Sequence, residues 1–272
     1  MGVSLAAAVV ASVLMGSAAI LQSLATRRAV GLLVLKHPLY VAGTVLDLIG
    51  WGLSVVAMRH LPLLAVQTIL AASLAVTVIL AARILRVKPS RSVWVAVIVV
   101  CLACGVVVVA AQPGPPAPAP AQFSLVLTFS LILLVAVAAL SYRHPRTPVC
   151  AVVAGMGYSG AAVAARAIHG SSIDALLKEP LVWLIVGFAI VGAVMFSRAL
   201  ETRADAVNEA SAWLWVIEIV VPSIVGVMAL GDQVRPGWAI PTVVAMIAAI
   251  VATMRISTSN TLLEHLVSPQ AS

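Results

Sequence analysis

Long apolar segments dominate the pattern of hydrophobic and polar residues along the chain, and short polar stretches separate them. Most of these segments are about 20 residues long, the length that an α-helix needs to cross the hydrocarbon core of a bilayer. The pattern therefore predicts an all-α membrane protein with nine transmembrane helices. The expected spans are residues 3–23, 38–58, 62–84, 92–111, 123–142, 148–168, 180–198, 206–230 and 237–255.

Prolines and a low-complexity segment mark the boundaries between these spans. Several prolines stand at or near expected helix starts, where the missing N–H of proline costs least. They are Pro38, Pro62, Pro148, Pro180 and Pro236. The stretch QPGPPAPAPAQ at 112–122 is rich in proline and alanine and carries no charge, which predicts an extended linker before the fifth span.

Composition agrees with a membrane protein. Hydrophobic residues make up 62% of the chain and charged residues only 9%, whereas soluble domains contain about 25% charged residues. The formal charge of +7 does not require nucleic acid, because basic residues of membrane proteins collect in cytoplasmic loops. The expected partner is therefore the lipid bilayer and not a nucleic acid.

The basic residues also predict which ends of the spans face the cytoplasm. Successive spans alternate in direction, so the lysines and arginines fall on two sides of the membrane. One side holds Arg27, Arg28, Lys36, Arg83, Arg86, Lys88, Arg91, Arg143, Arg146, Arg198, Arg203 and Arg255. The other side holds only Arg59, Arg166, Lys178 and Arg235. The first side is predicted to be cytoplasmic, which gives a multi-pass inner-membrane protein with its N-terminus outside and its C-terminus inside.

Two parts of the chain resemble each other in the same order. PLYVAGTVLDLIGWGLSVVAMRHLPLLAVQ at 38–67 aligns with PLVWLIVGFAIVGAVMFSRALETRADAVN at 180–208. Ahead of these, AVVASVLMGSAA at 8–19 resembles AVVAGMGYSGAA at 151–162. Equivalent spans lie an odd number of spans apart, so they begin on opposite membrane faces. This order predicts an inverted-topology repeat, which recurs in secondary transporters.

The repeat defines the expected organisation of the chain. Spans 1–4 correspond to spans 6–9, and span 5 joins the two groups. The expected parts are a first four-helix repeat at 1–111, the external linker and connector helix at 112–147, a second four-helix repeat at 148–255, and a cytoplasmic tail at 256–272 that is expected to be disordered.

A four-plus-five arrangement of this kind resembles the drug/metabolite transporter superfamily, in particular its NIPA-like and EamA-like branch. The segments that carry the resemblance are PLYVAGTVLDLIGWGLSVVAMRHLPLLAVQTILAASLAV at 38–76 and SRALETRADAVNEASAWLWVIEIVVPSIVGVMALGD at 197–232. The second is similar to that branch's pattern of a helix of small residues, a short polar turn and a helix with a central proline. The resemblance implies secondary transport, and eukaryotic members of the NIPA-like branch are associated with Mg²⁺.

Polar residues of span 8 fall on one helical face. Asn208, Ser211, Trp215, Glu218 and Pro222 form a single stripe at about 100° per residue. Pro222 withdraws an N–H and frees a carbonyl near Glu218, which suits a helix that borders a cavity. In the predicted repeat, Gln67 is the counterpart of Asn208 and Thr77 is the counterpart of Glu218. This stripe is predicted to face a polar pathway between the two halves.

Two further ionisable residues lie inside apolar spans, Asp47 in span 2 and Arg166 in span 6. Intramembrane ionisable groups usually mark substrate or ion pathways, so both join the predicted pathway residues. Three alternatives remain open. Arg166 reaches the surface by its long side chain, it forms a buried ion pair with Asp47 or Glu218, or the acids are protonated and hydrogen-bonded to a neighbouring helix.

The pattern favours a secondary transporter that moves a small solute by alternating access and is coupled to a proton or cation. One alternative is a Mg²⁺ transporter in which Asp47 and Glu218 bind the metal with Gln67 and Asn208, because Mg²⁺ prefers oxygen ligands. Another is a lipid-linked-sugar flippase or a non-transporting membrane subunit of an envelope complex. A second copy of the chain or an envelope protein is then a candidate partner. Since no nucleotide-binding, zincin or Ser/His/Asp motif occurs, we expect neither an enzyme nor a cofactor.

Overall fold

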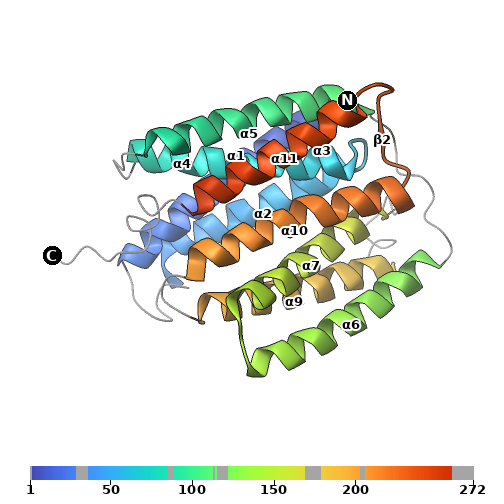
Figure 1. The fold of residues 1–272 in the computed structure, drawn as a ribbon. Coiled ribbons are helices and arrows are strands. Elements are labelled where there is room, and N and C mark those ends of the chain that lie inside the picture. The colour runs from blue at the N-terminus through green and yellow to red at the C-terminus, as the bar shows by residue number, and fades with distance from the viewer. Residues whose placement is uncertain are drawn as a thin grey trace.

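The computed structural model describes residues 2–28, 36–84, 89–112, 114, 122–168, 179–202 and 206–258. Long helices that run back and forth in one bundle make up nearly all of this part of the chain (Figure 1). The helices are α1 (Gly2–Arg28), α2 (Pro38–Met58), α3 (Leu63–Ala71), α4 (Ser73–Ile84), α5 (Arg91–Ala110), α6 (Phe123–Arg143), α7 (Thr147–Arg166), α9 (Pro180–Leu200), α10 (Ala206–Ala229) and α11 (Ala239–Ser257).

Nine segments of the described chain are helices long and apolar enough to cross a membrane, with α3 and α4 together forming one of them. The predicted all-α class and number of spans are confirmed to this extent. Prolines begin α2 and α9 at their first helical positions, as the sequence indicated. Of the expected disordered tail, only residues 256–258 lie within the described residues, where they finish and follow α11.

The third expected span is not one continuous helix, because it divides at Ala72 into α3 and α4. The Ala72 N–H is bonded to the Ile69 carbonyl at 3.0 Å, a tight turn of the kind that ends helices. At this break α1 comes unusually close. A Cβ added at Gly16 would lie 2.7 Å from both the Ser73 carbonyl oxygen and the Val76 Cβ, so glycine is required for this contact.

Two pairs of helices pack in the same manner in the two parts of the chain. α1 lies along α2 and α7 lies along α9, while α4 contacts α1 and α10 contacts α7. Two further contacts join the first part to the second, α5 with α11 and α3 with α10. α6 contacts α7 and α9 and otherwise lies at the periphery of the bundle (Figure 1).

The two ends of the bundle differ in how their apolar residues cluster. We call the end where α5 finishes and α6 begins the linker end, and the end where α11 finishes the tail end (Figure 1). At the linker end one buried cluster unites the turn around Leu61 and Leu63 with residues Ala161–Ala165 of α7 and with Leu230. Towards the tail end, α7, α9 and α10 form a cluster separate from that of α1, α4, α5 and α11.

A short strand pair, which the sequence did not predict, closes the linker end. β1 (Ala111–Gln112) pairs antiparallel with β2 (Gln233–Val234), with Ala111 opposite Val234. The Arg235 N–H extends the pairing by donating to the Ala110 carbonyl at 2.9 Å. The pairing fastens the end of α5 to the connection between α10 and α11.

Candidate functional site

Glu218 lies in the middle of α10 on a face that points into the bundle. To one side of it, Ile217 packs on α7 so closely that a Cβ at Gly155 would lie 2.7 Å from the Ile217 Cβ. To the other side, Gly226 packs next to Leu63 at the start of α3. Glu218 is half-buried between these contacts, and the exposed apolar residues Ile224 and Val227 occupy the opposite face. The helix therefore turns its carboxylate inward, and the predicted pathway at this face stays a prediction.

The rest of the predicted stripe follows Glu218. Ser211 and Trp215 are half-buried on the same face, and Pro222 is buried. Asn208 belongs to the first turn of α10, but its side chain lies outside the described residues. The structure thus places Ser211 and Trp215 with Glu218.

Asp47 and Tyr158 come from two other helices to the same region. Asp47 is exposed on α2, and the phenol of Tyr158 is half-buried on α7. Both lie near enough to Glu218 to interact with its charge. We call this group of three side chains from α2, α7 and α10 the acidic cleft, defined by Asp47, Tyr158 and Glu218.

Tyr158 was not among the residues predicted from the sequence. Its ring lies over α9, where a Cβ at Gly192 would come within 3.0 Å of it. One glycine thus leaves room for the ring beside the helix. The signal in the sequence was a single aromatic hydroxyl in a span otherwise rich in small residues, AGMGYSGAAVAA at 154–165.

Gln67 is buried and Thr77 is half-buried, whereas Asp47 of the acidic cleft is exposed. Gln67 is buried within α3, of which every residue is buried. The Thr77 hydroxyl donates to the Ser73 carbonyl at 2.9 Å and lies 3.3 Å from the Gly16 carbonyl. It is therefore bonded at the contact between α4 and α1. The pathway roles of both residues stay predictions.

Arg166 has a different partner from those considered in the sequence. Its guanidinium forms an ion pair with Asp232 at 2.7 Å, and the two side chains are only 2% and 1% exposed. The alternatives of an ion pair with Asp47 or Glu218, and of a side chain that reaches the surface, are therefore wrong. Asp232 was missed because it follows the apolar run of α10, where a carboxylate usually belongs to a solvated turn.

Backbone groups from three more segments surround this ion pair. Arg166 also donates to the Met58 carbonyl and lies 3.4 Å from the Gly114 carbonyl. The second oxygen of Asp232 accepts from the Leu63 N–H at 2.6 Å. Arg166 Nε has no hydrogen-bond partner among the described residues. We call this group the linker-end ion pair, and it ties α7 and α10 to the turn between α2 and α3.

The side chains that the structure describes provide few candidate ligands for a metal ion. Within them, no group of three or more His, Cys, Asp or Glu residues is placed to bind one ion. Asp47 and Glu218 offer two carboxylates, which is the smaller set of ligands that Mg²⁺ uses when it keeps several waters.

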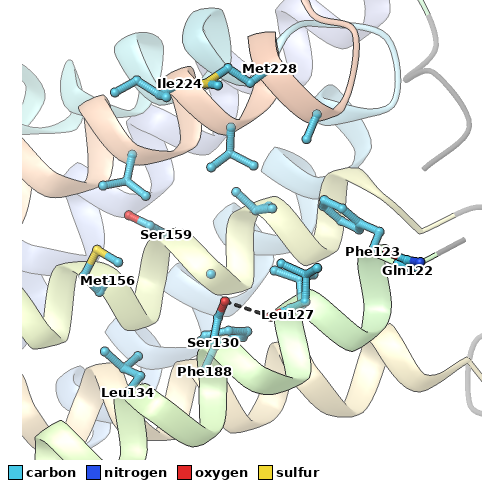
Figure 2. Close-up of a pocket in the computed structure, with 16 residues that line it drawn as sticks. Gln122, Phe123, Leu127, Ser130, Leu134, Met156, Ser159, Phe188, Ile224 and Met228 are labelled. Atoms are coloured by element: carbon cyan, nitrogen blue, oxygen red, sulfur yellow. Dashed lines mark hydrogen bonds between the residues drawn. The ribbon is translucent and has the colours of Figure 1, made fainter. Parts of the chain in front are cut away.

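A hollow lies on the side of the bundle, between α6 and α10 (Figure 2). It has a volume of about 480 Å³, and α7 forms its floor. Phe123, Leu127, Phe188 and Met228 point into it, and its polar lining is confined to Gln122, Ser130 and Ser159. We call it the lateral slot. Beside it α7 and α10 are in contact, where the Ser159 hydroxyl donates to the Ile217 carbonyl at 3.3 Å.

No protein-family model, curated protein or solved structure matches the chain. The functional inference therefore rests on the residues and geometry described above.

Proposed function

We propose that this protein is a secondary membrane transporter that moves a small solute by alternating access, coupled to a proton or cation. The observation that carries the proposal is the acidic cleft, which gathers ionisable groups from three helices inside an apolar bundle. A carboxylate within a bilayer is costly, and such groups usually line pathways for solutes, ions or protons. Asp47 and Glu218 bind the cation or proton, and Tyr158 provides a hydroxyl that donates or accepts a hydrogen bond.

The packing of the helices supports two halves related as an inverted repeat. The pairs α1 with α2 and α7 with α9 are equivalent in the sequence repeat, and they pack alike. The contacts of α5 with α11 and of α3 with α10 join helices that the repeat makes equivalent. Contacts between equivalent helices are expected on the axis of a two-fold relation. The same arrangement agrees with the resemblance to drug/metabolite transporters.

The difference between the two ends of the bundle supports alternating access. The shared apolar cluster and the linker-end ion pair close the linker end. Towards the tail end, α7, α9 and α10 keep a cluster separate from that of α1, α4, α5 and α11, which leaves the acidic cleft free to open between these two groups of helices. With the basic residues facing the cytoplasm, this conformation is open inward, and breaking the linker-end contacts opens the opposite side.

Water in the acidic cleft can be tested by cysteine accessibility. With Cys101, Cys104 and Cys150 replaced, Asp47→Cys is expected to react with a charged, membrane-impermeant thiol reagent, because position 47 faces the cleft. Val45→Cys is the matched control, because Val45 is 48% exposed on the same helix but lies about 200° around the helix axis from Asp47. Equal labelling of both positions, or of neither, would contradict an aqueous cleft at Asp47.

Orientation is tested separately. Gln112 is exposed at the linker end. In the same cysteine-free background, Gln112→Cys is expected to react with an impermeant reagent added outside intact cells, since few basic residues lie on that side. Reaction only after the cells are permeabilised would reverse the orientation and make the described conformation open outward.

The lateral slot favours a second candidate, a flippase for a lipid-linked sugar. Such a protein needs an opening between helices through which a lipid enters from the side, and the slot between α6 and α10 is open in this way. Its lining has few polar groups, however, and no charged side chain to bind a sugar phosphate. A thermal-shift screen of cations, amino acids, nucleosides and lipid-linked sugars distinguishes the two, because stabilisation by a lipid-linked sugar beyond that by phosphatidylglycerol would favour the flippase.

A further inference from the structure

Another hollow lies in the seam between α5 and α11, at the periphery of the bundle, and none of the acidic-cleft residues lines it. It is a groove with a volume of about 900 Å³. Val95 and Val99 line it from α5, and Val244, Ile247 and Val251 line it from α11. These residues recur at every turn of both helices, so the groove runs along the helix axes. Its shape and lining suit an extended hydrocarbon chain.

The tail end of the groove is polar. Arg255, Ser92 and Thr258 line it there, and all three are exposed. Within the described part of the chain, neither ion pair involves Arg255. Trp94 is 40% exposed in the next turn of α5, at the level where tryptophan commonly marks the boundary between hydrocarbon and head groups. The groove therefore combines an apolar trough with a cation at the depth of lipid phosphates.

We propose that this groove binds an anionic phospholipid, with an acyl chain along α5 and α11 and the phosphate at Arg255. The Ser92 hydroxyl donates to a phosphate oxygen while it accepts from the Ser90 hydroxyl at 2.8 Å. The Thr258 hydroxyl donates to the Met254 carbonyl at 2.9 Å and therefore has no proton for the phosphate. Of the described residues that line the groove, none is acidic, so they offer no partner to the ammonium group of a zwitterionic head group. The charge of the site therefore selects for lipids with a net negative head group.

A second copy of the chain suits this surface less well. In a symmetric dimer about an axis normal to the membrane, the same surface of each copy faces the other. The two Arg255 side chains would then approach each other at the same depth, and like charges repel. A lipid between α5 and α11 also contacts both predicted repeats, so its binding is expected to stabilise the bundle whether or not the protein is a transporter.

The test uses the purified full-length chain in neutral detergent, with phosphatidylglycerol and phosphatidylcholine as probes. Native mass spectrometry is expected to show tighter binding of phosphatidylglycerol, together with a higher melting temperature. Arg255→Gln is expected to weaken this binding about fivefold, the contribution typical of one arginine at an anionic surface. Arg143→Gln is the matched control, since Arg143 is exposed at the tail end of α6, outside the groove.

A second variant tests the trough. Ala248→Trp fills the groove, because Ala248 lines its middle, and is expected to reduce phosphatidylglycerol binding while Arg255 is intact. Equal binding of both lipids, or equal effects of Arg255→Gln and Arg143→Gln, would overturn the proposal. The proposal would also be overturned if the protein were a dimer that Ala248→Trp dissociates. It would equally be overturned if glycerol 3-phosphate, which has no acyl chains, raised the melting temperature as much as phosphatidylglycerol does. If Ala248→Trp fails to fold, the comparison of Arg255→Gln with Arg143→Gln still tests the proposal, because both arginines are exposed.

Discussion

Replacing Arg166 with glutamine is expected to lower the free energy of unfolding by about 3–5 kcal/mol, because it strands the buried carboxylate of Asp232. Asp232 keeps the Leu63 N–H as a donor but loses its only ion-pair partner among the described residues. The measurement is the melting temperature and the urea midpoint of the purified protein in detergent. Asp232→Asn is expected to have a similar cost, since it leaves the Arg166 charge buried.

The double variant distinguishes a coupled ion pair from two residues that stabilise the fold independently. Arg166→Gln combined with Asp232→Asn is expected to recover part of the lost stability, because no unpaired charge remains. Arg198→Gln is the matched control: Arg198 pairs with Glu201 at 2.6 Å, but the two side chains are 28% and 60% exposed. Exposed pairs typically contribute at most about 1 kcal/mol. If Arg166→Gln costs no more than Arg198→Gln, the linker-end ion pair does not close that end.

Glu218→Gln is expected to abolish transport while leaving the fold intact. Neither ion pair of the described chain includes Glu218, so the amide strands no positive charge. The amide keeps the shape of the side chain but cannot carry a negative charge or exchange a proton. The measurement is uptake into proteoliposomes of a solute found in the thermal-shift screen. The uptake is expected to fall to the level of empty liposomes at every pH and metal concentration tested.

Glu209→Gln provides the control, because Glu209 lies on the same helix, about half a turn around from Glu218, in the first turn. It is expected to transport normally. The pathway role would be withdrawn if Glu218→Gln melted at a much lower temperature, or if it transported as well as Glu209→Gln.

The sequence predicted the spans well because each depends on local properties. A run of apolar residues is long enough to span a bilayer or it is not, and Pro38 and Pro180 begin helices whatever packs beside them. The face of α10 that carries Glu218 also followed from helical periodicity. Periodicity fixes which residues share a face, and the exposed residues of the opposite face show which way that face turns.

The partner of each polar or aromatic side chain could not be predicted from such local properties. Arg166 was compared with Asp47 and Glu218 because these acids lie within spans, whereas its partner Asp232 lies just beyond one. Tyr158 was overlooked because an aromatic residue in an apolar span is ordinary until a glycine on another helix leaves room for its ring. Ala72 divides the third span although its sequence contains neither proline nor glycine there, and the close approach of α1 at Gly16 accompanies the break.

The sequence by itself thus determined the membrane class, the helices and the inward face of α10, because these follow from length, hydropathy and a fixed helical period. Only the tertiary structure decided that Asp47, Tyr158 and Glu218 come together from three helices, that Arg166 pairs with Asp232, and that one apolar cluster at the linker end joins the two parts of the chain. Those features join residues more than half the chain apart, such as Leu63 and Asp232. They depend on how helices cross and rotate against one another, which small residues such as Gly155 permit but do not specify.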